Sequence, residues 1–372
     1  MTTPPHDLHP ALQTPLCELV GVRFPVVQTG MGWVSGPGLT AATANAGGLG
    51  ILAGATMTFP ELETAVDEVR RATDASFGVN LRADQPDVTD RIDLLADCGV
   101  RVASFALAPK PELIERCKER GLVVIPSVGA SRHAEKVAAW GADAVIVQGG
   151  EGGGHTGPVP TSLLLPDVVD RVDIPVIAAG GFRDGRGLVA ALAYGAAGIA
   201  MGTRFLLTRE SPVVDEAKQI YLGKSLTDTV VTTEIDGVPQ RVLRAGAVES
   251  VADMGRVRRL IGAIRRAAEF KRLSGTSWAA MIREGVAMRR SRGLAWHQVL
   301  LAANAPMLYR AALLEGRTDV GIMASGQVTG LIDDLPSCAE LIDRLLLEAD
   351  TVLRRLEAPT PSGPPTDPQE MP

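Results

Sequence analysis

Short runs of apolar and β-branched residues recur through the first 205 residues, and a helical pattern follows each of them. The runs show no polar alternation, so they predict strands that are buried on both faces. Stretches such as PELETAVDEVRRA and SRHAEKVAAWG are amphipathic, and a glycine closes several of these predicted helices, as is typical of a helix C-terminus. The eight predicted strands are 24–30, 49–54, 77–82, 100–107, 122–129, 144–150, 174–181 and 198–205.

This alternation of strands and helices predicts an α/β fold, and within that class a (β/α)8 TIM barrel. A doubly wound open sheet is the competing architecture, because a count of strands alone does not exclude it. The barrel is favoured because the count stops at eight. It is also favoured because residues suited to chemistry stand at the carboxyl ends of the strands, where such barrels carry their active sites.

The rhythm breaks after residue 222, where the sequence predicts a smaller, mainly helical inserted or lid domain. Its basic stretch at 256–272 is interpreted either as a solvated helix face or as a lid surface that meets an anionic cofactor or carrier. The proline-rich, polar end of the chain is expected to be disordered. The predicted organisation is an N-terminal arm at 1–19, the barrel at 20–222, the insert at 223–300, C-terminal helices returning to the barrel at 301–356 and a disordered tail at 357–372.

Composition and charge limit the classes of function. The chain has 372 residues and a formal net charge of −6, so no global basic surface favours nucleic acid as a partner. Its four cysteines stand far apart without a Cys-x-x-Cys pair, which predicts reduced thiols and argues against a zinc site. No signal-peptide pattern or bilayer-length apolar run is present, so a soluble, cytoplasmic protein with no membrane partner is expected.

Glycines at the ends of the last two predicted strands point to a phosphate group. Gly180 and Gly181 end strand seven, and Met201, Gly202 and Thr203 end strand eight. Glycine lets backbone N–H groups approach a phosphate closely, and the start of a following helix adds a favourable dipole. These two turns therefore predict a phosphate cradle.

Two amide side chains extend this prediction to a heterocyclic cofactor. Asn80 and Gln148 stand at the ends of strands three and six. An amide both donates and accepts hydrogen bonds, which suits the edge of an isoalloxazine ring. Either amide alone could equally be a loop cap, but together with the phosphate cradle they favour FMN.

The segment VQGGEGGGHTG at 147–157 places six glycines around one histidine, His155. Glycine costs about 0.5–1 kcal/mol relative to alanine in regular structure, so this cluster indicates a tight turn or a close approach of backbone to a ligand. His155 is the only one of the five histidines in a glycine-rich loop at a strand end, and imidazole suits proton transfer at neutral pH. His155 is therefore the predicted catalytic residue, no metal ligands are predicted, and Glu151 is expected only to organise the loop.

Three motifs resemble the nitronate monooxygenase (2-nitropropane dioxygenase) family. They are QGGEGGGHTG, PVIAAGGFRDGRGLVAALAYGAAGIAMGTRFL and NAGGLGILAG, and the resemblance covers residues 20–210 with a further echo at 324–332. The same superfamily includes FMN-dependent enoyl-acyl-carrier-protein reductases, and MGTRFLLTRESP is more similar to that branch. The resemblance implies an FMN-binding barrel with a smaller neighbouring domain.

Carried over residue by residue, the resemblance gives His155 the catalytic role, as the base that takes the proton α to nitrogen in nitronate oxidation. In the reductase branch the matching histidine supports proton donation or substrate binding instead. The positions that the resemblance places on the flavin or its phosphate are Thr29, Gly30, Met31, Asn80, Gln148, Gly153, Gly180, Gly181, Met201, Gly202 and Thr203.

The first functional hypothesis is an FMN-dependent nitronate monooxygenase that converts alkyl nitronates and O2 to carbonyl compounds and nitrite. The alternative is an NAD(P)H-dependent FMN reductase acting on an enoyl thioester or a quinone, with Arg204 and the basic helix holding NADPH or carrier phosphates. A flavin-free barrel is the third hypothesis, disfavoured by His155 and the paired amides. The sequence leaves open both NAD(P)H as a second cofactor and assembly into a homodimer.

Overall fold

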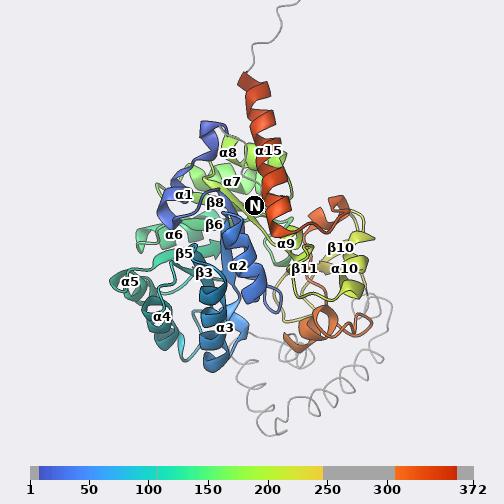
Figure 1. Ribbon diagram of the computed structural model, residues 1–372, viewed down its shortest axis with the longest axis horizontal. Helices are drawn as coiled ribbons and strands as arrows, with labels where there is room; N and C mark the ends of the chain where they lie inside the picture. The colour runs from blue at the N-terminus through green and yellow to red at the C-terminus, as the bar shows by residue number, and fades with distance from the viewer. Residues whose placement is uncertain (1–7, 107, 246–305, 358–372) are drawn as a thin grey trace, which may run out of the picture.

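The computed structural model describes residues 8–106, 108–245 and 306–357, and a closed barrel of parallel strands forms its centre (Figure 1). The pairing of β1 with β9, Val27 beside Ala200, closes the barrel and excludes the open sheet. The TIM-barrel prediction is thereby confirmed, and each strand of the barrel lies inside a predicted run. In spatial order the strands are β1 (Val26–Gln28), β2 (Leu49–Leu52), β3 (Phe77–Leu81), β4 (Val102–Phe105), β5 (Val123–Val128), β6 (Val145–Gln148), β8 (Val176–Ala179) and β9 (Gly198–Met201).

Burial on both faces explains why the strands lack polar alternation. Val27, Ile51 and Ile177 belong to the same buried cluster, to which seven of the eight barrel strands contribute residues. Leu52 and Val79, on alternate positions, instead pack among buried residues of the surrounding helices. Both faces of each strand therefore exclude water, as expected for a parallel barrel sheathed by helices.

Helices alternate with the strands, and local signals set their ends. At the start of α3, Glu61 Oε2 accepts hydrogen bonds from both the backbone N–H and the hydroxyl of Thr58, each at 2.8 Å. The helices of the barrel and its flanks are α1 (Pro15–Val20), α2 (Pro37–Asn45), α3 (Phe59–Ala72), α4 (Val88–Asp97), α5 (Pro111–Glu119), α6 (Ser131–Ala139), α7 (Thr161–Val169), α8 (Gly185–Ala193), α9 (Thr203–Leu206), α10 (Asp215–Leu222) and α15 (Cys338–Glu357). Short 3-10 turns occupy Pro10–Leu12, Gly54–Thr56 and Gln327–Leu331.

Helix α1 covers the amino-terminal end of the barrel. Leu16 and Val20 join the buried cluster of Val27 and Ile51, and the Thr14 hydroxyl donates to the Ala197 carbonyl at 2.6 Å, directly before β9. The opposite end, where the strands have their carboxyl termini, is left for the loops that carry the predicted site residues.

A second, small sheet lies beside the barrel (Figure 1). It consists of β10 (Thr229–Thr232), β11 (Gln240–Leu243) and β7 (Gly154–His155), all antiparallel, in the order β10-β11-β7. A mainly helical insert was expected from residue 223 onward, but the described part of it, 223–245, forms this β-hairpin. The hairpin pairs with the glycine-rich loop of the barrel, a partner about 85 residues distant in sequence that local patterning does not reveal. The predicted basic helix at 256–272 lies outside the described residues.

Helix α15 returns across the barrel and packs against α8 and α2 (Figure 1). Gly185 permits the close approach, because a Cβ there would lie 2.4 Å from the Leu345 carbonyl oxygen.

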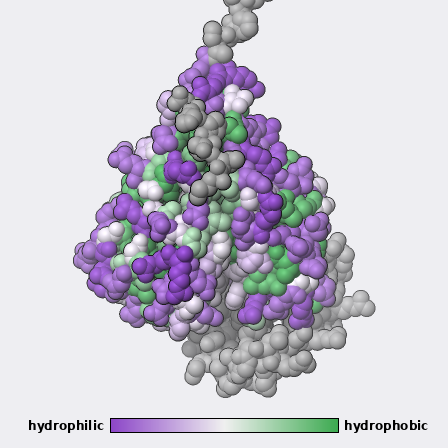
Figure 2. All heavy atoms as spheres, viewed as in Figure 1, coloured by the Kyte–Doolittle hydropathy of each residue, from purple (hydrophilic) through white to green (hydrophobic). Residues whose placement is uncertain are grey.

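In the view of Figure 2 hydrophilic residues cover most of the face, with apolar residues in small groups. Across residues 8–106, 108–245 and 306–357, no helix combines the length and the apolar character that crossing a membrane requires.

Candidate active site

The carboxyl ends of β1, β3 and β9 bring one group of predicted residues together. The Thr29 N–H donates to the Met201 carbonyl at 3.2 Å. Gly30 lies against Asn80 so closely that a Cβ on the glycine would come within 2.5 Å of the asparagine Cβ. A Cβ on Gly202 would likewise lie 3.4 Å from the Met31 sulfur. The first and last strands of the barrel and β3 thus present these residues side by side.

Asn80 is suited by its position to bind a ligand. It is 7% exposed, yet its amide forms no hydrogen bond with any described residue. Its amide can therefore donate to and accept from a bound polar molecule. Gln148 differs, because its Nε2 donates within the loop, to the His155 carbonyl at 2.7 Å and to the Gly153 carbonyl at 3.4 Å.

The two glycine turns after β8 and β9 have the geometry of an anion site. Gly180 and Gly181 both adopt positive φ, +102° and +86°, which orients successive N–H groups in a way that other residues rarely allow. The N–H groups of Gly181 and Gly202 form no hydrogen bond within the described part of the chain. Thr203 begins α9, and its hydroxyl accepts a hydrogen bond from the Gly326 N–H at 2.9 Å.

The glycine-rich loop after β6 lies against a distant backbone segment. A Cβ on Gly153 would stand 2.6 Å from the Gly326 nitrogen, and the Gln327 N–H donates to the Glu151 carbonyl at 3.0 Å. Close packing of backbone on backbone therefore accounts for part of the glycine excess. The segment 324–327 thereby joins the edge of the site.

Glu151 anchors the same loop to the barrel. Its carboxylate accepts hydrogen bonds from the Thr161 N–H at 2.9 Å and from the Thr161 hydroxyl at 2.8 Å, at the first residue of α7. An acidic group at a helix start satisfies a free N–H and interacts favourably with the helix dipole. This role was missed in the sequence, where only the loop location of Glu151 was visible.

His155 lies on β7 beside β11 and faces a carboxylate. Its Nε2 is 2.6 Å from Asp236 Oδ2, and the histidine side chain is 58% exposed while the aspartate side chain is 13% exposed. Asp236 belongs to the turn between β10 and β11, so the second sheet brings it to the barrel loop. Asp236 was also missed, because 81 residues separate it from His155 and nothing in its local sequence marks it.

Burial and hydrogen bonds act in opposite directions on Asp236. Burial alone would raise the pKa of its carboxyl, but the hydrogen bond and the charge of His155 outweigh that effect, so the pKa is lowered. The Val238 N–H, which donates to Oδ1 at 3.0 Å, and the side chain of Gln240 contribute further. The carboxylate is therefore ionised at neutral pH.

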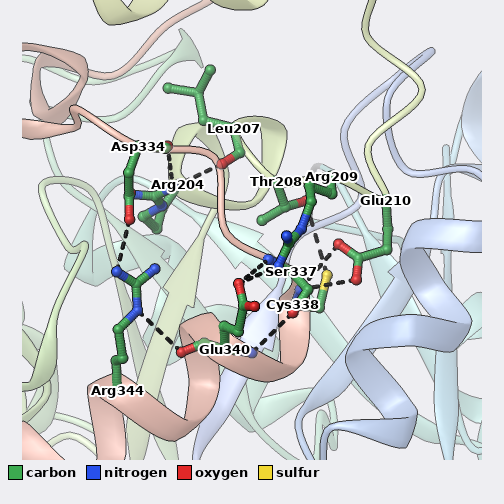
Figure 3. A network of polar contacts seen from close by, with 10 residues as sticks. All are labelled: Arg204, Leu207, Thr208, Arg209, Glu210, Asp334, Ser337, Cys338, Glu340 and Arg344. Atoms are coloured by element: carbon green, nitrogen blue, oxygen red, sulfur yellow. Dashed lines mark hydrogen bonds and ion pairs between the residues drawn. The ribbon is translucent and has the colours of Figure 1, made fainter.

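Arg204 does not lie free at the site, contrary to the hypothesis that it holds a NADPH or carrier phosphate. It is 5% exposed and forms an ion pair with Asp334 at 2.8 Å, and it also donates to the Leu207 carbonyl at 2.7 Å. Figure 3 shows this pair within a larger network that includes Arg344 and the start of α15. Arg204 thus fixes the segment before α15 to the turn after β9, because both of its terminal guanidinium nitrogens donate inside the protein.

Asp184 accepts a hydrogen bond from the Gly187 N–H at 3.1 Å and caps α8, as its position before that helix predicts.

Cys17, Cys98, Cys117 and Cys338 are all free thiols. Burial raises the pKa of the Cys117 and Cys338 thiols to about 12, so neither is a reactive thiolate. The described ranges contain no group of three or more His, Cys, Asp or Glu side chains that could hold a metal ion.

The sequence profile of the family described as nitronate monooxygenase matches residues 13–93 and 88–348. The chain belongs to the nitronate monooxygenase family. It is an oxidoreductase enzyme, as predicted, and its family implies a flavin cofactor.

Two curated relatives are similar over nearly the whole chain. A (3aS,4S,5R,7aS)-5-hydroxy-7a-methyl-1-oxo-octahydro-1H-indene-4-carboxyl-CoA dehydrogenase from Rhodococcus jostii is 60% identical, over 93% of this chain and 98% of its own length. A protein of the same name from Mycobacterium tuberculosis is 61% identical, over 93% of this chain and 99% of its own length. A probable nitronate monooxygenase from Staphylococcus saprophyticus is 33% identical, over 62% of this chain and 78% of its own length.

Among solved structures, FabK from Thermotoga maritima is similar with a TM-score of 0.75 and 33% identity. The match covers 92% of this chain and 98% of that one. The similarity to FabK thus extends over nearly the whole of both chains.

Proposed function

We propose that this protein is an FMN-dependent dehydrogenase acting on the coenzyme A thioester of a fused-ring carboxylic acid. The observation that carries the proposal is the 60% identity to the Rhodococcus jostii carboxyl-CoA dehydrogenase, which extends over 93% of this chain. Similarity to the Staphylococcus saprophyticus nitronate monooxygenase is 33% and covers 62% of this chain. The dehydrogenase relatives therefore match segments that the other relative does not.

FMN suits the residues at the carboxyl end of the barrel. The N–H groups of Gly181 and Gly202, which form no hydrogen bond within the described ranges, offer donors for its phosphate, next to the start of α9. The Asn80 amide, to which no described residue hydrogen-bonds, offers a donor and an acceptor for the edge of the ring. Thr29, Gly30 and Met31 would lie along the cofactor on the β1 side, and Gly153 on the β6 side. These assignments remain predictions for each residue.

His155 supplies the proton acceptor of the proposed reaction. Dehydrogenation removes one proton and one hydride from adjacent atoms, and a bound flavin would supply the acceptor for the hydride. A thioester carbonyl acidifies the hydrogen on its α-carbon, so a histidine on the exposed rim of the site suits removal of that proton. We therefore place the new double bond between the α and β carbons, the reverse of the reaction of the enoyl reductases that the sequence resembles.

Nitronate oxidation is the second candidate, favoured by the family match and by the probable nitronate monooxygenases among the relatives. When the second candidate starts from the neutral nitroalkane, both reactions begin with removal of a proton from a carbon next to an electron-withdrawing group, which is a thioester in one and a nitro group in the other. The same His155 would serve both reactions. The substrate, rather than the base, separates them.

Reduction of the bound flavin without oxygen tests the proposal directly. The purified protein should be yellow, and its visible absorbance should bleach within one turnover when the octahydro-indene carboxyl-CoA named for the relatives is added anaerobically. The matched control is the same ring acid without coenzyme A, which should leave the flavin oxidised. Bleaching by propionate 3-nitronate and not by the thioester would establish the nitronate candidate instead. Bleaching by NADPH alone would support the reductase alternative.

A further inference from the structure

We propose that Asp236 is a positioning residue that holds the proton of His155 on Nε2 and leaves Nδ1 as the atom that accepts the substrate proton. The inference rests on the proposed function for the identity of that proton. It adds a residue outside the barrel to the site, because Asp236 belongs to the turn between β10 and β11.

The protonation state of Asp236 decides which ring nitrogen carries hydrogen. A carboxylate without its proton accepts hydrogen bonds and donates none. The lowered pKa of Asp236 keeps it in that form at neutral pH, against the effect of burial, because His155 favours the charge. The 2.6 Å contact between Oδ2 and Nε2 therefore requires Nε2 to be the donor. Neutral imidazole has one N–H, so Nδ1 holds the free electron pair.

The backbone around this pair is held from both sides. On one side, β7 and β11 pair with His155 opposite Gln240, and Gln148 Nε2 donates to the His155 carbonyl at 2.7 Å. On the other side, the Val238 N–H donates to Asp236 Oδ1 at 3.0 Å, which leaves Oδ2 for the histidine. The ring is thus oriented by a carboxylate that is itself fixed, the arrangement by which a buried aspartate sets the tautomer of a catalytic histidine.

The other ionisable side chains described near the pair form their hydrogen bonds with residues other than His155. Tyr309, from the helical residues 306–313, hydrogen-bonds to Gln240, and burial followed by the charge of Asp236 raises the pKa of its hydroxyl, so it stays neutral. Arg241 on β11 donates to the Gly150 carbonyl at 2.8 Å and to the Thr229 hydroxyl at 3.0 Å. The carboxylate of Glu151 is engaged by Thr161. Among the described residues, Asp236 is therefore the charged group that contacts His155 directly.

The proton step follows from this arrangement. The bond between the α-carbon and its hydrogen breaks, a new N–H bond forms at Nδ1, and the electron pair stays on the substrate next to the thioester carbonyl. The imidazolium that results carries its positive charge 2.6 Å from the Asp236 carboxylate. Stabilisation of that cation is the second contribution of Asp236, since an opposite charge within about 4–6 Å favours the charged form.

Nitrogen NMR of protein with 15N-labelled histidine tests the tautomer without any substrate. The His155 signals, assigned by their loss in His155→Asn, should show a protonated Nε2 and an unprotonated Nδ1 at pH 8. In Asp236→Asn, whose amide can donate as well as accept, the Nδ1-protonated form should become substantially populated. Protonation of Nδ1 in the unmodified protein, or identical spectra in the two proteins, would overturn the inference.

Kinetics supply the second readout. Asp236→Asn should lower kcat for the thioester by at least about 100-fold with KM changed less than about threefold, and Asp236→Glu should restore part of the loss. The matched control is Glu234→Gln, which removes a negative charge from the same turn and should leave kcat near its original value. An equal loss in the Glu234 variant would show a general charge effect and contradict the positioning role. Absence of thioester turnover in the unmodified protein would instead refute the proposed function, while the NMR result still decides the tautomer.

Discussion

The backbone of Gly153 lies against the backbone of Gly326, so that a Cβ on the former would stand 2.6 Å from the nitrogen of the latter. Two segments 173 residues apart thus meet without room for a side chain. The contact joins the loop that carries His155 to the segment that donates a hydrogen bond to Thr203. The contact thus connects the predicted catalytic loop with the predicted phosphate turn.

Replacing Gly153 by alanine should therefore disturb both cofactor and loop. The extra methyl group overlaps backbone atoms, which cannot rotate away, so we expect a loss of about 1–3 kcal/mol in the free energy of unfolding. Thermal unfolding and the ratio of flavin to protein after purification measure the effect. Gly38→Ala is the matched control, because Gly38 lies within α2, has no positive φ and has nothing within 4 Å of an added Cβ. Equal flavin content and unfolding temperature in the two variants would argue against the close packing.

Asn80→Ala should weaken flavin binding while leaving the apoprotein nearly as stable. The buried amide has no partner in the described part of the chain, so its removal breaks no hydrogen bond in the flavin-free protein. In the flavin complex the variant loses about 1 kcal/mol per hydrogen bond, or roughly fivefold in Kd. Fluorescence titration of apoprotein with FMN gives the Kd, and chemical denaturation gives the stability. An unchanged Kd would remove Asn80 from the flavin site.

His155→Asn should retain bound flavin and slow its reduction by the thioester by about 100-fold or more, the contribution typical of a general base. The side chain is more than half exposed, so the fold should tolerate the exchange. Stopped-flow bleaching of the flavin measures the rate, and the visible spectrum confirms flavin content. With an already ionised nitronate the loss should be small, because no proton remains to be removed. A full-rate variant on the thioester would exclude His155 as the base.

Asp334→Asn should destabilise the protein by about 2 kcal/mol, because it leaves the Arg204 guanidinium, which is 5% exposed, without its counter-charge. Burial opposes the ionisation of Asp334, but hydrogen bonds from Arg344 and Arg204 prevail and lower its pKa. The ion pair of Asp334 therefore contributes its full stabilisation at pH values above the ordinary carboxyl pKa of about 4. This contribution declines as the pH falls through the lowered pKa of Asp334. Unfolding curves from pH 7 to pH 2 should therefore show the two proteins converging only in acid.

The exposed pair of Asp67 and Arg70, 3.7 Å apart on α3, provides the comparison. Asp67→Asn should leave the unfolding temperature almost unchanged, because solvent screens surface charges and little burial is lost. A difference between the parent and Asp334→Asn that stays constant into strong acid would contradict the assigned role of Asp334.

Much of the fold could be predicted because its signals are local. Runs such as IPVIAAGG and LVVIPSVG are apolar throughout, since barrel strands are buried on both faces. Eight of them in regular alternation with helices favour a closed barrel over an open sheet. The parallel arrangement then brings all strand ends to one side, which is why Asn80 and Gly202 could be assigned to one site without coordinates.

The second sheet could not be predicted in the same way. Its strands have at most four residues each, and β11 is stabilised by pairing with β7 from a loop far away in sequence. Short strands obtain most of their stability from such neighbours rather than from intrinsic propensity. The hairpin at residues 223–245 was therefore not anticipated, while the helical part predicted for the insert lies outside the described residues.

By itself, the sequence determined the alternation of strands and helices, the glycine turns at the strand ends and the prominence of His155, because periodicity and glycine content act over a few residues. Only the tertiary structure decided what those residues contact. It placed Asp236 on His155, Glu151 on the start of α7, and Arg204 on Asp334 rather than on a ligand. A hydrogen bond or ion pair depends on distances of a few ångströms between side chains far apart in the sequence, and those distances exist only once the chain has folded.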